Sequence, residues 1–287
     1  MAMASEGSAR LGEISYGSFE RSGNLIPRVH AIEFEDCDWV PKFIRDGIVL
    51  ALGFLFKTLK IYHPAFPAFY EFAGQTPVLD LASGSGTHIE ELMRDAVRHD
   101  RPLPDICLSD INPNITRFER LKRSLPGNLD FRSQPCDATR VLPDSSRPLL
   151  SMFTAFHHLR PAQAAALLAN AAARSDGIII FDPVARTIPN ISGNVAGIIF
   201  GILAPFFRQG FSWKQFVFST LIPVIPFMLA FDGVSSALRA YTKSDVEEMI
   251  ASLPPNDFDW EVSVTRGKGL AAMCQGLLII GRRKNWR

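Results

Sequence analysis

The feature of the chain that most constrains its fold is a short apolar segment followed by a glycine-rich loop and a helical pattern. Residues 78–81 are apolar apart from Asp80, and the loop at residues 82–86 has the sequence Ala-Ser-Gly-Ser-Gly. Beyond the loop, apolar residues recur at the spacing of one helix face, namely Ile89, Leu92, Met93, Ala96 and Val97. This order predicts a nucleotide site, because glycines admit a ligand close to the backbone and a helix N-terminus offers free N–H groups.

The spacing of the glycines distinguishes between nucleotides. The dinucleotide pattern GxGxxG needs glycine at positions 82, 84 and 87, but the chain has Ala82 and Thr87 at two of them. The phosphate-binding pattern GxxxxGK[ST] does not occur in the sequence. The pattern (D/E)xGxGxG of S-adenosylmethionine sites is met by Asp80, Gly84 and Gly86, and Ala82 is its one departure.

Further strands and helices alternate after the loop. Apolar runs predict four more strands, at residues 105–111, 129–132, 149–156 and 178–181. An alanine-rich helix is expected over residues 161–174, and Asn112 is expected to cap an earlier helix that has Pro113 at its first position. The alternation predicts an α/β fold with a doubly wound, mostly parallel sheet.

The last part of the chain continues this pattern. Thr242 is expected to cap a helix whose buried face carries Val246, Met249, Ile250 and Leu253. Residues 257–265 and 277–281 are expected to form two final strands joined as a hairpin.

Four segments, taken in order, resemble the class I S-adenosylmethionine-dependent methyltransferases. They are the glycine loop, an acid that ends the second strand, an aspartate after the third strand, and a histidine pair after the fourth. In this chain they are residues 78–86, Ser109-Asp110-Ile111-Asn112, Cys136-Asp137-Ala138 and Phe156-His157-His158-Leu159. The resemblance covers roughly residues 77–182 and implies a Rossmann-like fold, methyl transfer and S-adenosylmethionine as the cofactor.

The resemblance implies a role for each residue of the loop. The backbone of Ala82, Ser83, Gly84 and Gly86 would pack against the amino-acid part of the cofactor. Asp80 would either hold this loop or meet the cofactor ammonium group. Alanine at position 82 is the chief departure from the family, because alanine tolerates fewer backbone conformations than glycine.

The resemblance also implies contacts for the nucleoside. Asp110 would accept hydrogen bonds from both ribose hydroxyls, and Ile111 would lie against the adenine face. Asp137 would accept from the adenine amino group, and Ala138 would offer a backbone N–H there. Taken without the resemblance, an aspartate after a strand is equally a turn residue or a helix cap.

Two groups of residues are candidates for chemistry and for substrate binding. His157 and His158 follow strand four, where either could deprotonate an acceptor hydroxyl or position the acceptor; alternatively they simply begin the next loop. Asp232, Arg239 and Tyr241 could form a substrate wall, and the string around them is similar to one in a little-characterised subgroup of the family. The alternative there is an Asp232–Arg239 salt bridge that fastens a lid.

The domain organisation follows from length and hydropathy. The 287 residues suit one large domain with an insertion. Residues 1–74 are expected to form an N-terminal arm and helical cap, including a helical segment at 39–60. Residues 75–287 are expected to form the Rossmann-like domain, with a hydrophobic insertion at about 187–231 after strand five.

The insertion is unusually apolar. Residues 195–207 contain no charged side chain, and residues 216–231 add only Ser219 and Thr220 as polar groups. Each run is shorter than a membrane-spanning helix needs, and prolines interrupt both of them. Residues 191–231 could therefore lie in a membrane surface, cover a hydrophobic substrate, or form an oligomer interface.

Charge and cysteine usage exclude some functions. With 30 basic and 29 acidic residues the formal charge is +1, which disfavours nucleic acid as a partner. The four cysteines stand far apart without a CxxC pair, so no zinc site is expected and a reducing compartment fits. The first residues lack the apolar run of a signal peptide, and we expect a protein on the cytoplasmic side.

These observations favour a methyltransferase that acts on a hydrophobic small molecule, either lipid-like or a secondary metabolite. A nicotinamide-dependent reductase is disfavoured by the glycine spacing and by the lack of a Tyr-x-x-x-Lys pair. A non-catalytic, membrane-associated scaffold that retains the cofactor fold remains an alternative. The fold accepts oxygen, nitrogen and carbon as acceptor atoms, so the sequence leaves the acceptor atom open.

Overall fold

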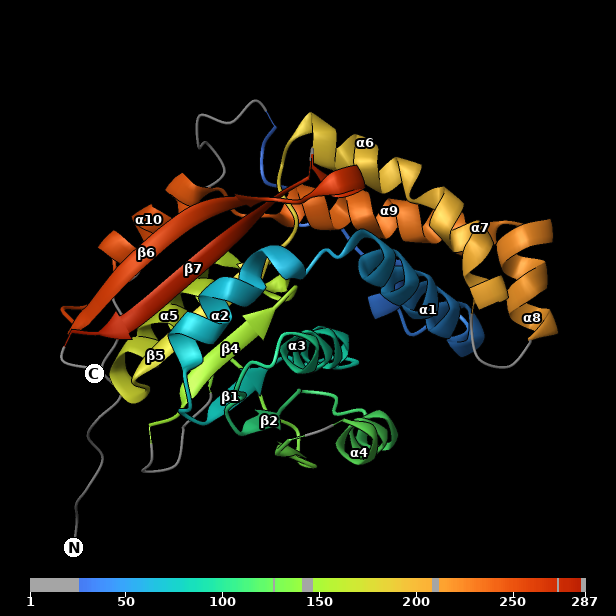
Figure 1. Cartoon of the computed structure of the whole chain (residues 1–287). Helices are drawn as coiled ribbons and strands as arrows, with labels where there is room; N and C mark the ends of the chain where they lie inside the picture. The colour runs from blue at the N-terminus through green and yellow to red at the C-terminus, as the bar shows by residue number, and fades with distance from the viewer. Residues whose placement is uncertain (1–25, 126, 141–146, 208–211, 273, 285–287) are drawn as a thin grey trace, which may run out of the picture.

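A seven-stranded sheet forms the centre of the chain (Figure 1). The computed structural model describes residues 26–125, 127–140, 147–207, 212–272 and 274–284; most of the expected N-terminal arm lies outside them. In spatial order the strands are β3 (Leu129–Phe131), β2 (Ile106–Leu108), β1 (Val78–Leu81), β4 (Leu149–Phe153), β5 (Gly177–Asp182), β7 (Gln275–Arg283) and β6 (Phe258–Arg266). The pairings are parallel from β3 to β5, and β7 is antiparallel to both β5 and β6. The predicted doubly wound, mostly parallel sheet and its C-terminal hairpin are confirmed.

Helices cover both faces of the sheet. On one face pack α2 (Phe66–Ala73), α3 (Thr87–Arg98) and α4 (Ile115–Ser124), and on the other α5 (Pro161–Arg174) and α10 (Lys243–Ala251). β4 and β5 are buried along their whole length, as is typical of parallel strands covered on both sides.

Local sequence signals account for several helix ends. α5 begins at Pro161, a residue suited to the first helical position, and covers the predicted range. Thr242 caps α10 as predicted, and its hydroxyl accepts from the N–H of Asp245.

Two predictions about helices on the other face are wrong in detail. The cap of α4 is Asn114 instead of Asn112, and its side chain accepts from the N–H of Arg117 at 3.2 Å. Two asparagines flank Pro113, and only the second is placed to reach that N–H. Val97 in α3 is 59% exposed, because the buried face of this helix ends at Ala96.

A helical bundle projects from the carboxyl side of the sheet (Figure 1). It consists of α1 (Lys42–Leu59) and the insertion helices α6 (Ile188–Ala196), α7 (Ile198–Phe207), α8 (Trp213–Phe216), the π-helical turn η5 (Val217–Leu221) and α9 (Val224–Arg239). Its own apolar core includes Ile44, Ile48, Ala51, Ala204, Ile225 and Leu229. The sequence therefore builds a second, smaller core in which an N-terminal helix packs against a segment more than 150 residues away in the chain.

The insertion contains a longer helical stretch than its apolar runs suggest. Among the described residues, Ile188–Phe207 is the one helix long and apolar enough to cross a membrane by length and composition. This stretch consists of α6 followed directly by α7, and the residues of α6 are less apolar than those of α7. A second apolar pair, Trp213–Leu221 and Val224–Arg239, is bent by 69°.

Candidate functional site

A cavity of about 810 Å³ lies between the carboxyl ends of β1 and β4 and the helical bundle. Its walls come from the glycine loop, the segment after β4, α1, α6, α9 and the N-terminal segment at residues 33–35. β1 and β4 are neighbours, with β2 and β3 on one side and β5 on the other. The strand order thus reverses at this point, which is where open α/β sheets bind ligands.

Asp80 anchors the glycine loop. Its side chain is fully buried, and its carboxylate accepts hydrogen bonds from Ser83 Oγ and Ser151 Oγ, both at 2.6 Å. His88 Nε2 lies 2.8 Å from the same carboxylate, and its ring stacks on Phe153 with 5.0 Å between the ring centroids. Of the two roles expected for Asp80, the geometry matches the one that holds the loop.

The loop adopts a left-handed turn at three positions. Ala82, Gly84 and Gly86 have φ values of 51°, 53° and 67°. A Cβ on Gly86 would lie 2.7 Å from Leu121 Cδ1, whereas one on Gly84 would meet no atom within 4 Å. Alanine at position 82 therefore keeps the loop shape, at the backbone cost that a side chain brings in this region.

Asp110 links the second strand to the loop. One carboxylate oxygen accepts from the N–H of Gly84 at 2.7 Å, and the other accepts from the N–H of Asn112 at 2.8 Å. Gly84 and Asn112 line the cavity, so the acid stands at its rim. Beside it Ile111 is 56% exposed, which leaves an apolar side chain free at the mouth of the site.

Asp137 and Ala138 lie in a loop that reaches the same rim. The N–H of Cys136 donates to the carbonyl of Asp110 at 2.8 Å, which brings this loop beside the end of β2. The carboxylate of Asp137 accepts from the N–H and hydroxyl of Thr139 at 2.9 and 2.7 Å. Asp137 and Ala138 are half-buried and do not line the cavity. The structure thus places the Asp137 loop beside Asp110, and the contacts that Asp137 makes are those of a turn-stabilising residue.

His157 is held by an acid that the sequence interpretation missed. Its Nδ1 lies 2.8 Å from Asp182 Oδ1, and its backbone N–H donates to Asp182 Oδ2 at 2.8 Å. Burial alone would lower the pKa of His157, but the charge and hydrogen bond of Asp182 outweigh it, and the pKa is raised above its ordinary value. Asp182 ends β5, the neighbour of β4, at the carboxyl edge of the sheet. That position was the sequence signal that could have identified Asp182 as a site residue.

His158 has the opposite electrostatics. Its Nδ1 lies 3.1 Å from Arg239 Nη1 and 3.6 Å from Glu33 Oε2. Burial, then the nearby charges of His157 and Arg239, hold the pKa of His158 well below its ordinary value. Because arginine can only donate, Nδ1 of His158 accepts and its proton lies on Nε2. His157 therefore favours its protonated form more than a free histidine does, and the neighbouring His158 favours its neutral form.

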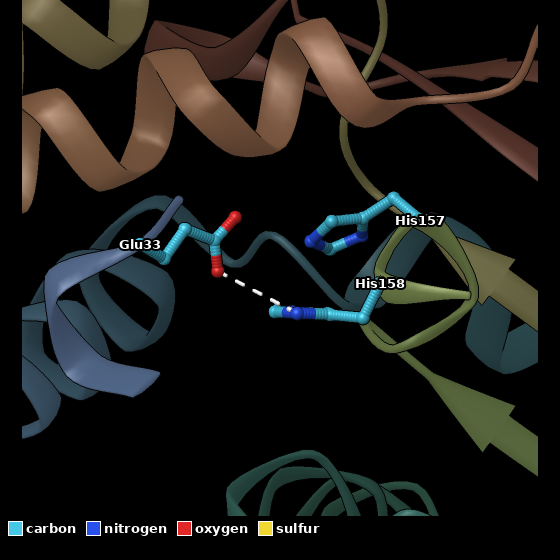
Figure 2. A group of neighbouring side chains, drawn as sticks. All are labelled: Glu33, His157 and His158. Carbon is cyan, nitrogen blue, oxygen red and sulfur yellow. Dashed lines mark ion pairs between the residues drawn. The ribbon is translucent and has the colours of Figure 1, made fainter. Parts of the chain in front are cut away.

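Glu33, His157 and His158 resemble the ligand set of a transition metal, and Figure 2 shows them facing one another. Their potential ligand atoms lie within 4.8 Å of one another. However, Arg239 Nη1 is 3.1 Å from Glu33 Oε1 and equally close to His158. A guanidinium is permanently charged, so Arg239 already neutralises the carboxylate and opposes a second cation.

Two of the residues expected to form a substrate wall, Asp232 and Arg239, bind the backbone of the N-terminal segment. Asp232 accepts from the backbone N–H groups of Phe34 and Glu35 at 2.7 and 3.1 Å. Arg239 donates to the carbonyl of Ala31 at 2.6 Å. The hydroxyl of Tyr241 donates to the carbonyl of Leu159 at 2.7 Å.

Arg28 completes this arrangement. Its guanidinium lies 4.1 Å from the ring centroid of Tyr241 and donates to the carbonyls of Leu159 and Arg239. Of the three residues expected in the substrate wall, only Asp232 lines the cavity. These contacts hold residues 28–35 in place, and Glu33 and Glu35 of this segment line the cavity.

The apolar side of the cavity comes mainly from α1, which the sequence interpretation did not assign to the site. Lining residues there are Ile48, Val49, Leu52, Leu55 and Phe56. Tyr62 and Thr154 also line the cavity, and Thr154 has a φ of 58°, which is strained for a β-branched residue. The cavity therefore has three parts: an end formed by the glycine loop, a corner formed by His157 and His158, which we call the histidine corner, and the apolar wall formed by α1.

The fold is shared with solved methyltransferase structures. The plantazolicin methyltransferase BpumL in complex with SAH is similar over 87% of this chain and 92% of its own, with a TM-score of 0.52 and 12% sequence identity. The chain has the class I methyltransferase fold. Identity at this level shows the fold alone. No protein-family model matches the sequence, and no curated protein matches it.

Two other methyltransferase structures are similar over most of this chain. The plantazolicin methyltransferase BamL, in complex with a triazolic desmethylPZN analog and SAH, covers 85% of this chain and 99% of its own, with 11% identity and a TM-score of 0.49. The magnesium protoporphyrin IX methyltransferase ChlM from Synechocystis PCC 6803 covers 86% and 88%, with 12% identity and a TM-score of 0.45.

Proposed function

We propose that the protein is an S-adenosylmethionine-dependent methyltransferase whose acceptor is an apolar small molecule. The observation that carries the proposal is one cavity bounded by the glycine loop, by His157, which is paired with Asp182, and by the apolar wall of α1. The shared fold with BpumL, which was solved with the product S-adenosylhomocysteine, supports the choice of cofactor.

The residues at the loop fit this cofactor. Open space around Gly84 leaves a cradle that a Cβ would begin to fill, and Asp110 stands beside it with an ionisable carboxylate. In the proposed complex the loop backbone holds the amino-acid part, and Asp110 accepts from the ribose hydroxyls. Ile111, Asp137 and Ala138 surround the adenine. When bound, the cofactor supplies a methyl group on a positively charged sulfur.

The histidine corner can move the proton that a hydroxyl acceptor must lose. Asp182 engages Nδ1 of His157, which leaves Nε2 as the proton acceptor. In the proposed step, Nε2 would take the proton that an acceptor hydroxyl must lose when its oxygen receives the methyl group from the cofactor sulfur. Asp182 then stabilises the imidazolium, because the same interaction that raises the pKa of His157 favours its charged form. His158, whose pKa is lowered, donates through Nε2 and orients the acceptor.

The apolar wall of α1 and Leu229 of α9 select the class of acceptor. A lipid-like molecule or an apolar secondary metabolite would remove this surface from water on binding. A location on the cytoplasmic side of a membrane, with contact through residues 191–231, would supply such a molecule. The formal charge of +1 offers little attraction to nucleic acid.

The test is release of S-adenosylhomocysteine from S-adenosylmethionine with alkylphenols of increasing chain length. We expect kcat/KM to rise with chain length, and Asp182→Asn to lower kcat by about a hundredfold or more. Asp130→Asn, at an exposed aspartate on β3, is the matched control and should leave kcat unchanged. Cofactor binding without turnover on any acceptor would favour a non-catalytic scaffold instead.

A further inference from the structure

The far end of the helical bundle is strongly apolar and exposed. Figure 1 shows the end of α7 and α8 projecting well beyond the sheet. Six large side chains between the end of α7 and the first turn of α9 are 55–69% exposed, and we call them the apolar tip: Phe206, Phe207, Trp213, Leu221, Ile222 and Phe227. A clustered apolar surface of this kind on a water-soluble domain marks an interaction site.

The apolar tip rests on ordered packing. The ring of Phe207 stacks on Phe54 of α1 with 4.8 Å between centroids. Phe216 lies 5.7 Å from Phe206 and 5.8 Å from Trp213, again between ring centroids. The exposed faces of these rings are therefore presented by a fixed frame.

The charge of the insertion indicates what covers the tip. Residues 188–231 contain no acidic side chain, and their charged residues are Arg208 and Lys214, both near the tip in sequence. Lys214 Nζ lies 5.8 Å from the ring centroid of Phe43, at the start of α1. A segment that combines exposed aromatic side chains with basic groups and contains no acid suits a surface that combines hydrocarbon with negative headgroups.

The polar contacts of α6 exclude a spanning arrangement for the long helix. Asn190 is buried, and its amide donates to the carbonyl of Gln275 in β7 at 2.9 Å. The amide of Asn194 donates to the carbonyl of Gly233 at 2.6 Å. The first half of Ile188–Phe207 thus belongs to the body of the protein, and only its last turns are free to enter a bilayer.

We propose that the apolar tip inserts into the surface of a bilayer that carries anionic lipids, so that the protein binds peripherally without spanning the membrane. The same helix α1 packs behind the tip and forms the apolar wall of the cavity. When the tip enters the bilayer, α1 therefore holds the apolar wall of the cavity in a fixed orientation relative to the lipid. This membrane binding does not require methyl transfer.

The test is flotation of the full chain with phosphatidylcholine vesicles, prepared with and without phosphatidylserine. We expect the wild-type protein to float with the anionic vesicles and to be released by high salt. Phe207→Ser with Trp213→Ser should lower the partition coefficient by about tenfold or more. The control pair is Ile188→Ser with Val264→Ser, whose side chains are 69% and 51% exposed but lie at the other end of the helix and on β6; it should float like the wild type.

Two results would overturn the proposal. One is equal flotation of the tip variant and the control variant. The other is a wild-type dimer that floats with neither vesicle and that the tip substitutions convert to a monomer, which would assign the tip to a second copy. Calorimetry with S-adenosylhomocysteine on the same samples separates the two proposals, because the tip variant should retain wild-type affinity for it.

Discussion

Replacing Asp80 by asparagine tests how the glycine loop is held. The carboxylate is fully buried and accepts from two serine hydroxyls at 2.6 Å, with His88 Nε2 at 2.8 Å. An amide keeps one acceptor oxygen, but it removes the charge and turns an NH2 group toward a donor. Hydrogen bonds to a charged acceptor are worth about 1.5–3 kcal/mol each, and the serines can rotate to recover part of that loss. We therefore expect Asp80→Asn to lower the free energy of unfolding by about 2–4 kcal/mol.

The assay is equilibrium unfolding in urea, followed by tryptophan fluorescence and by circular dichroism. Asp130→Asn is the control, since Asp130 is exposed and its pair with Lys122 is worth less than about 1 kcal/mol. Ser151→Ala isolates one of the three interactions and should cost about 1–2 kcal/mol. If Asp80→Asn is no more destabilising than Asp130→Asn, the carboxylate does not anchor the loop.

Four further predictions address the loop, the histidines and the rim. Gly84→Ala should lower the free energy of unfolding by about 1–2 kcal/mol because of the left-handed φ at this position. Gly86→Ala should cost ~1–3 kcal/mol more than Gly84→Ala, because its Cβ also meets Leu121. Equal losses in the two variants would contradict the expected clash with Leu121. In a histidine NMR titration His157 should titrate above 6.5 and His158 well below it. Because folding raises the pKa of His157, its protonation stabilises the fold fully below about pH 6.5, and this stabilisation is lost as the pH rises through the raised pKa, so Asp182→Asn should destabilise more at low pH; the reverse dependence would contradict the assignment. Asp110→Ala should weaken S-adenosylhomocysteine binding by about 2–4 kcal/mol, and wild-type affinity in the folded variant would remove Asp110 from the site.

The sheet and its helices could be predicted because their signals are local. The alanine-rich run after Pro161 specifies α5, and the continuous apolar residues of β5 specify a buried parallel strand. The cap of α4 was ambiguous, since Asn112 and Asn114 flank the same proline. Signals of this kind reach across a few residues, which is enough for the order of elements.

The completed histidine corner depends on contacts between distant parts of the chain. Asp182 meets His157 because β4 and β5 pair in a register that aligns Phe153 with Phe181. Glu33 reaches Arg239 and His158 from a segment with no periodic pattern. Asp232 and Arg239 were singled out from the sequence, but their partners in residues 31–35 could not be inferred, because a backbone N–H or carbonyl group leaves no trace in residue type.

Calorimetric titration of the full chain with S-adenosylhomocysteine, with NADPH as a parallel ligand, tests the central claim most directly. A class I fold with Gly84, Gly86 and Asp110 arranged around one loop should bind S-adenosylhomocysteine with micromolar affinity and should not bind NADPH. Binding of NADPH alone would contradict the assignment of the loop. Binding of neither ligand by the folded protein would contradict the proposed cofactor.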